Sequence, residues 1–312
     1  MFKPNLKKFS LSLIASSLTV MSGLIFDGLV SHALAQTSTG QKQSKPVQSM
    51  GNKQLKSRVG KFVLVYQPSR IREHQALQEF LQKVGLFEAL ISVFNNSGLV
   101  MRYDVPVVFA DCGVVNAFYS PENKSITMCH ELIFQMAKDF IRVKKVSTEE
   151  ALTDALFASV FVFFHELGHA LIDILPLPTV GNEEDAVDQF SAILLLDTEK
   201  PDVVIKTVYN AALWFGNSPQ APAWDEHAPS DVRYYNLICL MYGKDSNQYG
   251  VFAKELQGRA TKCGNEYKKV SQSWEQLLLP HFADNNNSRG GNSSSEPPRN
   301  PPSRGARPGQ IW

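Results

Sequence analysis

The stretch FFHELGHALIDILPLPTVGNEEDAVDQF, residues 163–190, places two histidines and a glutamate inside the most apolar helix that the sequence predicts. His165 and His169 are four residues apart, so on a helix they share one face and their imidazoles can converge on one ion. Glu166 can contact a water on that ion without ligating it. In this HExxH arrangement the histidines hold zinc and the glutamate acts as general base. Because burying unpaired ionisable groups is costly, a bound cation is favoured over two coincidental core histidines.

The third ligand of a catalytic zinc should come from the acids of the following segment, GNEEDAVDQF. Glu184 and Asp188 are one helical turn apart, so Glu184 on the zinc would leave Asp188 placed to bond the far nitrogen of a ligating histidine. Glu183 and Asp185 are the alternative ligands. The acids could also simply complement the positive end of a helix, but that interpretation does not explain the E-x-x-x-D spacing. We therefore predict Glu184 as the third zinc ligand.

The elements before and after this stretch predict a sheet followed by helices. In chain order the sequence predicts a strand at 61–66, a helical region at 70–95, and strands at 105–110, 114–119 and 125–129. The turn-rich segment SPENK joins the last two strands into a hairpin. Ser147 and Glu150 form a capping box that opens the apolar helix, Pro176 ends it after Leu175, and Asn182 or a neighbour caps the next helix. The predicted fold class is α+β, with a mixed sheet followed by a mostly helical half.

The N-terminus predicts export. Its first 36 residues combine early lysines, an apolar run from Phe9 and the triplet Ala33-Leu34-Ala35, which is the layout of a cleaved signal peptide over residues 1–35. An uncleaved membrane anchor is the alternative, but Asp27 inside the apolar run argues against a stable span. We expect a secreted or periplasmic protein.

Composition indicates one globular domain. The chain has 312 residues, 44% of them hydrophobic, and a net charge of +1. A balance so close to neutral does not indicate a positive electrostatic field that would attract nucleic acid. Residues 36–57 predict a flexible linker and residues 284–312 a disordered tail, which leaves 58–283 as the folded domain. Four cysteines in an oxidising compartment predict two disulfides. Of the three possible pairings, the local ones are favoured: Cys112–Cys129 and Cys239–Cys263.

HELGH followed by EDAVD resembles the gluzincin metallopeptidases, the group of thermolysin and neprilysin, whose pattern is HExxH followed by ExxxD. VVNAFYSPENKSI resembles the edge-strand motif of that group, which implies that Asn116 and Ala117 bind the substrate main chain. DEHAPSDVR resembles the D-x-H-x-P-x-x-x-R segment of neprilysin-type enzymes. It implies that His227 stabilises the tetrahedral oxyanion, Asp225 orients His227 and Arg233 binds a substrate carbonyl. The implied fold is zincin-like, with the hairpin at the sheet edge. The folded region also resembles an uncharacterised bacterial family labelled "putative metallopeptidases".

The chain departs from the gluzincin pattern in two ways. Only 14 residues separate His169 from Glu184, fewer than is usual for thermolysin or neprilysin, so the loop LPLPTVGN must turn tightly. The chain is also much shorter than neprilysin and lacks room for a second large lobe. We expect a more open cleft.

The leading hypothesis is a zinc peptidase acting on a peptide or protein substrate, in which Glu166 takes a proton from a zinc-activated water and passes it to the leaving amine. A non-catalytic zinc-binding or peptide-binding module of the same fold is the main alternative. A zinc hydrolase of a non-peptide amide is a third hypothesis. The complete set of catalytic residue types favours an enzyme, and the edge-strand resemblance favours an extended peptide substrate. Neither nucleic acid nor a membrane is an expected partner.

Overall fold

The computed structural model describes residues 59–197, 200–220 and 224–283. The contacts of the chain define one unit that ends at Phe282, and of the unit that follows only Ala283 is described. The predicted signal peptide, linker and C-terminal tail therefore lie outside the described residues.

Four strands form one mixed sheet in the order β1-β2-β4-β3. Their bounds are β1 Phe62–Tyr66, β2 Val105–Ala110, β3 Ala117–Ser120 and β4 Ser125–Cys129. β2 pairs in parallel with both β1 and β4, whereas β3 pairs antiparallel with β4 and lies at the edge. The predicted hairpin is thus confirmed, with Ala117 opposite Met128 and Ser120 opposite Ser125.

Two predicted element boundaries were wrong. The strand expected from residue 114 begins only at Ala117, and residues 114–116 belong to the loop that precedes it. The helical region expected over 70–95 is two helices, α2 Arg72–Val84 and α3 Leu86–Asn96. Gly85 separates them with φ 68°, a left-handed conformation that ends α2 and that glycine adopts without a steric cost.

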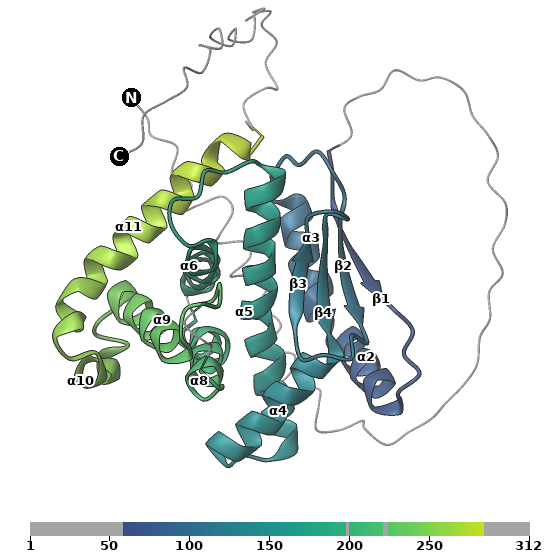
Figure 1. Cartoon of the computed structure of the whole chain (residues 1–312), viewed down its shortest axis with the longest axis horizontal. Coiled ribbons are helices and arrows are strands. Elements are labelled where there is room, and N and C mark those ends of the chain that lie inside the picture. The colour runs from purple at the N-terminus through teal and green to yellow at the C-terminus, as the bar shows by residue number, and fades with distance from the viewer. Residues whose placement is uncertain (1–58, 198–199, 221–223, 284–312) are drawn as a thin grey trace, which may run out of the picture. The chain divides into compact units, whose positions relative to one another are not determined.

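The remaining helices follow the sheet in the sequence, which confirms the α+β class. They are α4 His130–Lys144, α5 Thr148–Ile174, α6 Glu183–Leu196, α7 Pro201–Val204, the π-helix η2 Ile205–Tyr209, α8 Asn210–Gly216, α9 Ser230–Lys244, α10 Ala253–Leu256 and α11 Ala260–Leu278, with short 3-10 turns η3 Gly250–Phe252, η4 Gln257–Arg259 and η5 Leu279–His281. Figure 1 shows α5 standing between the sheet and the group formed by α6, α8 and α9.

Helix α5 is the centre of the core. Ser147 caps it by accepting a hydrogen bond from the Glu150 amide. One face packs on β3 and β4, and the others pack on α4, α6 and α8, which explains why the helix is apolar on all sides. Among the described residues it is the one helix long and apolar enough to cross a membrane, yet 94% of its most apolar window is buried inside the fold. Its hydrophobicity is therefore accounted for by the core.

Both predicted disulfides are present. Cys112 is bonded to Cys129 at the end of the sheet, and Cys239 of α9 is bonded to Cys263 of α11. The local pairing is thus confirmed, and each bridge joins two neighbouring elements of the fold.

Candidate metal centre and active site

The site is built where α6 crosses close to α5. Gly168 lies inside the HELGH motif, and a Cβ atom at this position would lie 2.7 Å from Val187 Cγ1 and 2.8 Å from Val187 Cβ of α6. Such distances are shorter than real Cβ contacts, so only glycine permits this approach. Asn182 caps the start of α6 by accepting from the Glu184 amide. The first turn of α6 is thereby directed at the histidines of α5.

Three histidine side chains surround one carboxylate. Glu184 Oε2 lies 3.0 Å from His165 Nε2 and 3.1 Å from His227 Nε2, and Glu184 Oε1 lies 3.3 Å from His169 Nε2. Ligating atoms of His165, His169 and Glu184 all lie within 4.8 Å of one another. His227 stands farther off, with its ring centroid 6.1 Å from that of His165, compared with 5.0 Å between His165 and His169. The first three residues form a candidate metal centre that His227 faces.

The geometry of this centre fits a metal ion better than a hydrogen-bond network. Glu184 Oε2 is buried and, despite the short distances, has no hydrogen-bond partner of acceptable geometry among the described residues. Atoms bound tetrahedrally to zinc with bonds of about 2.0 Å lie about 3.3 Å apart, close to the separations seen here. Two imidazoles and one carboxylate also form a donor set that zinc commonly takes. The residues present therefore fit a zinc site.

Each histidine is oriented through its second ring nitrogen. His165 Nδ1 lies 2.8 Å from Asp188 Oδ1, His169 Nδ1 lies 2.8 Å from Glu183 Oε1, and His227 Nδ1 lies 3.0 Å from Asp225 Oδ1, each pair within hydrogen-bond distance. Such outer contacts fix the ring and turn the other nitrogen toward the centre.

Arg233, at the start of α9, holds Asp188 in turn. Its Nε and Nη2 donate to the two oxygens of Asp188 at 2.7 and 2.8 Å, a bidentate pair. The guanidinium also lies over the ring of Phe215, with Cζ 3.6 Å from the centroid. In this structure Arg233 thus bonds to Asp188, while it also lines the cavity into which a substrate would reach.

Electrostatics at the centre are strongly coupled. Burial alone would lower the pKa of His169, but hydrogen bonds to Glu184 and Glu183 outweigh burial and raise it to about 9. Burial alone would raise the pKa of Glu184, but its histidine neighbours, His165 first, hold that pKa far below its ordinary value. Without a metal the site therefore keeps protons on its histidines. A metal cation supplies the same positive charge, so its binding must displace protons.

Glu166 lies beside the centre and against the edge strand. It is buried, and burial raises the pKa of its carboxyl group, although a hydrogen bond from the Tyr119 backbone acts in the opposite direction. The carbonyl of Asn116 accepts from the Cys129 amide, so in the alternating antiparallel ladder the backbone groups of Ala117 point away from β4. Both Asn116 and Ala117 line the cavities on the two sides of the centre.

The cavity has two halves that share Asn116, Ala117, His165, Glu166 and His227. One half carries apolar side chains from the loop before β3, α4, α5 and α8, namely Val115, Leu132, Val162, Trp214 and Phe215. The other half is lined by carboxylates, namely Asp173, Glu183, Glu184 and Glu226. A peptide lying along β3 would therefore pass the metal centre with apolar side chains on one side of it and carboxylates on the other.

Nine of the ten site residues named from the sequence line this cavity, and the tenth, Asp188, contacts His165 and Arg233 behind it. Sequence reasoning missed the contact of Glu183 with His169 and the contact of Arg233 with Asp188. The position of Glu183, one residue before the predicted ligand, was the available signal, but it was considered only as an alternative ligand. For Arg233, no local pattern could have named Asp188, which lies 45 residues away.

An α+β fold that presents two helix-borne histidines, a carboxylate and a buried glutamate beside an edge strand has the features of a metallopeptidase. Residues 66–278 match the model of the family DUF4344, described as "Putative metallopeptidase". Since this match covers more than half of the chain, the protein belongs to that family. No curated protein and no solved structure matches the chain. Family membership suggests peptide-bond hydrolysis and a bound metal ion, whereas the likeness to thermolysin and neprilysin rests on the motifs.

Proposed function

We propose that the protein is an exported zinc-dependent peptidase with His165, His169 and Glu184 as zinc ligands. The observation that carries the proposal is the buried Glu184 Oε2, which lies 3.0 Å from His165 Nε2 yet has no hydrogen-bond partner of acceptable geometry in the part of the chain that the structure describes. The buried Glu166 follows His165 directly in α5. When bound there, zinc would lower the pKa of a water molecule toward neutrality and polarise a carbonyl group.

Glu166 is the general base in this proposal. Its pKa is raised by burial, so its carboxylate can accept a proton from the attacking water and then release it to the leaving amine. The Tyr119 backbone fixes the side chain against β3, where the scissile bond would lie. Glu166 does not belong to the group of possible ligands formed by His165, His169 and Glu184.

His227 is proposed to stabilise the oxyanion. Its pKa is raised, chiefly by the Glu184 carboxylate, whose Oε2 lies 3.1 Å from His227 Nε2, so it can carry a proton toward the cavity. Asp225 holds the ring from the other side by accepting from both the amide and Nδ1 of His227, at 2.9 and 3.0 Å. Arg233 orients His165 through Asp188, and its contact with a substrate carbonyl remains a prediction.

The substrate is proposed to be an extended peptide that adds to the edge of the sheet at β3. The outward backbone groups of Ala117 and the side chain of Asn116 are the available partners for its main chain. We further propose that the chain is exported and acts outside the cytoplasm or in the periplasm. Two disulfides among the four cysteines support this setting.

The decisive experiment compares three variants of the zinc-loaded protein on a peptide library. Glu166→Gln should retain zinc and lower kcat by about a hundredfold or more, because only the proton acceptor is lost. His227→Ala should lower kcat by about a hundredfold with little change in KM, and Asn116→Ala should change both. A wild-type protein that binds zinc but cleaves nothing, or an undiminished Glu166→Gln variant, would overturn the proposal.

A further inference from the structure

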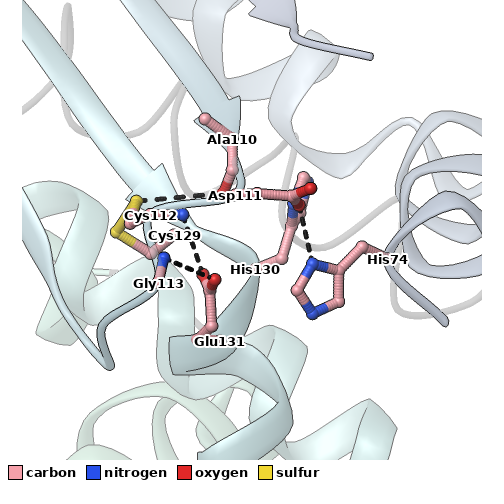
Figure 2. The surroundings of a disulfide bond; sticks show 8 residues. All are labelled: His74, Ala110, Asp111, Cys112, Gly113, Cys129, His130 and Glu131. Atoms are coloured by element: carbon pink, nitrogen blue, oxygen red, sulfur yellow. Dashed lines mark hydrogen bonds and ion pairs between the residues drawn. A yellow bond between two sulfur atoms is a disulfide. The ribbon is translucent and has the colours of Figure 1, made fainter. Parts of the chain in front are cut away.

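The loop from Asp111 to Asn116 carries one wall of the cleft. It leaves β2, passes the end of the central strand β4, and enters the edge strand β3 on the far side. Because β2 and β4 are parallel, the last residue of β4, Cys129, and the first residues of α4, His130 and Glu131, lie beside this crossing. Figure 2 shows the loop start next to these residues. The loop therefore packs against the first residues of α4.

Asp111 anchors the first residue of the loop. Oδ2 of Asp111 accepts from Ser69 Oγ at 2.6 Å, and Oδ1 lies 2.6 Å from His74 Nδ1 and 2.8 Å from His130 Nδ1. These are hydrogen-bond lengths, shorter than the separation of about 3.3 Å between ligand atoms around tetrahedral zinc. The cluster therefore acts as a hydrogen-bonded clamp that ties the end of β2 to α2 and α4.

Glu131 holds the next two residues. Its two carboxylate oxygens accept from two successive amides of the loop, Oε1 from Gly113 at 2.7 Å and Oε2 from Cys112 at 3.2 Å (Figure 2). The Cys112–Cys129 disulfide closes the same turn from the other side. Gly113 takes φ 71°, so the chain turns sharply at the residue that Glu131 holds.

After Gly113 the loop is exposed as far as Asn116. Val114 and Val115 are about half exposed, and Asn116 is also exposed, while Val115 and Asn116 line the cavity. The direction in which they project is thus set by the anchored residues before them and by the bond from the Cys129 amide to the Asn116 carbonyl.

We propose that Glu131 is a positioning residue of the substrate site, which fixes the Cys112–Gly113 turn so that Val115 and Asn116 face the bound peptide. The inference rests on the proposed peptidase function, because Asn116 is there the substrate-binding side chain. Glu131 itself contacts two backbone amides and would not touch the substrate. Its role is carried through the loop.

The variant Glu131→Gln tests this role with little change in shape. A glutamine keeps one acceptor oxygen but turns an NH₂ group toward a loop amide, so one of the two bonds is replaced by a contact between donors. Hydrogen exchange at the Cys112 and Gly113 amides should become roughly tenfold faster or more. In the zinc-loaded protein, kcat/KM for peptides should fall by about tenfold, with both kcat and KM affected.

A double-mutant cycle separates positioning from general stability. If Glu131 acts through Val115 and Asn116, the double variant Glu131→Gln/Asn116→Ala should lose less activity than the two single losses combined. Additive losses would overturn the proposal. Glu150→Gln is the matched control, because it removes an acid from the first turn of α5, at the end remote from the histidines, and should leave exchange in the loop and kcat/KM unchanged.

The failure of each proposal can be told apart. If the wild type cleaves peptides and Glu131→Gln behaves like Glu150→Gln in both exchange and kinetics, the positioning role is wrong while the peptidase function stands. If the wild type cleaves no peptide, the peptidase function fails and the substrate part of the inference fails with it. Exchange at Cys112 and Gly113 then still decides whether Glu131 holds the loop.

Discussion

Three consecutive acids at the start of α6 have three different surroundings. Glu184 faces the Nε2 atoms of His165 and His169, and Glu183 accepts from the far nitrogen of His169. Asp185 has no histidine partner among the described residues, and burial followed by the nearby charge of Asp188 raises its pKa. Three consecutive residues in one helical turn therefore differ in role: Glu184 is a proposed ligand, Glu183 orients a ligand, and Asp185 does neither.

These surroundings predict an order of zinc affinities. Glu184→Ala should weaken binding most because it removes a ligand, and Glu183→Ala should weaken it by about 10–100-fold because it frees the His169 ring. Asp185→Ala should bind nearly as the wild type does. Competition with a chelator of known affinity measures all three. A larger loss in Asp185→Ala than in Glu184→Ala would move the third ligand to Asp185.

Stability of the metal-free protein should depend on pH through His169. Its folded-state pKa of about 9 lies above the ordinary value of 6.5, so the protonated ring stabilises the fold fully below about pH 6.5. That stabilisation is lost as the pH rises through about 9. Denaturation of chelated protein should therefore give a lower free energy of unfolding at pH 9 than at pH 6.5. His169→Ala should show a smaller change, and an equal or rising stability in the unmutated protein would contradict the assignment.

At the scale of elements, the site depends on how closely α6 approaches α5. Gly168 occupies the crossing, although a glycine inside a helix costs about 1 kcal/mol relative to alanine. Val187 fills the space that a side chain at this position would need. The acids of α6 can reach the histidines because this one position carries no Cβ atom.

Gly168→Ala should therefore disturb both the core and the metal site. Overpacking of this kind costs about 1–3 kcal/mol of unfolding free energy, and displacement of α6 should weaken zinc binding. Gly264→Ala is the matched control, since Gly264 lies inside α11 with nothing within 4 Å of its would-be Cβ atom. It should stabilise the protein by about 0.5–1 kcal/mol and leave zinc affinity unchanged. Thermal unfolding and chelator competition measure both, and equal behaviour of the two variants would contradict the role of Gly168.

For the whole molecule, the second disulfide ties α9 to α11 on the helical side of α5. Both of its cysteines are fully buried, and they close a segment of 24 residues. The chain-entropy model gives about 3.5 kcal/mol for a loop of this length. Cys239→Ala/Cys263→Ala should lower the free energy of unfolding by about this amount in a denaturant titration, and the folded variant should retain its zinc. An unchanged midpoint would indicate that packing alone holds these helices together.

The sequence by itself determined the features that depend on residues close together in the chain. The hairpin, the cap at Ser147 and the apolar, largely buried α5 follow from residue periodicity, turn residues and capping chemistry, all of which act within one element. The spacing of His165, Glu166 and His169 on one helix is likewise fixed by the 3.6-residue turn. Gly85 was overlooked because a helical pattern continues on both sides of it, and the strand expected from residue 114 begins only at Ala117.

Only the tertiary structure decided which side chains meet across elements. It placed Glu184 against the histidine Nε2 atoms, Arg233 on Asp188, and Glu131 under the loop that leads to Asn116. Sequence spacing fixes angles within one helix or strand, whereas the relative placement of α4, α5, α6 and α9 follows from how their apolar faces pack and from how closely Gly168 lets two of them approach. The residue types of the site are thus written in local patterns, and their roles are set by packing between segments far apart in the chain.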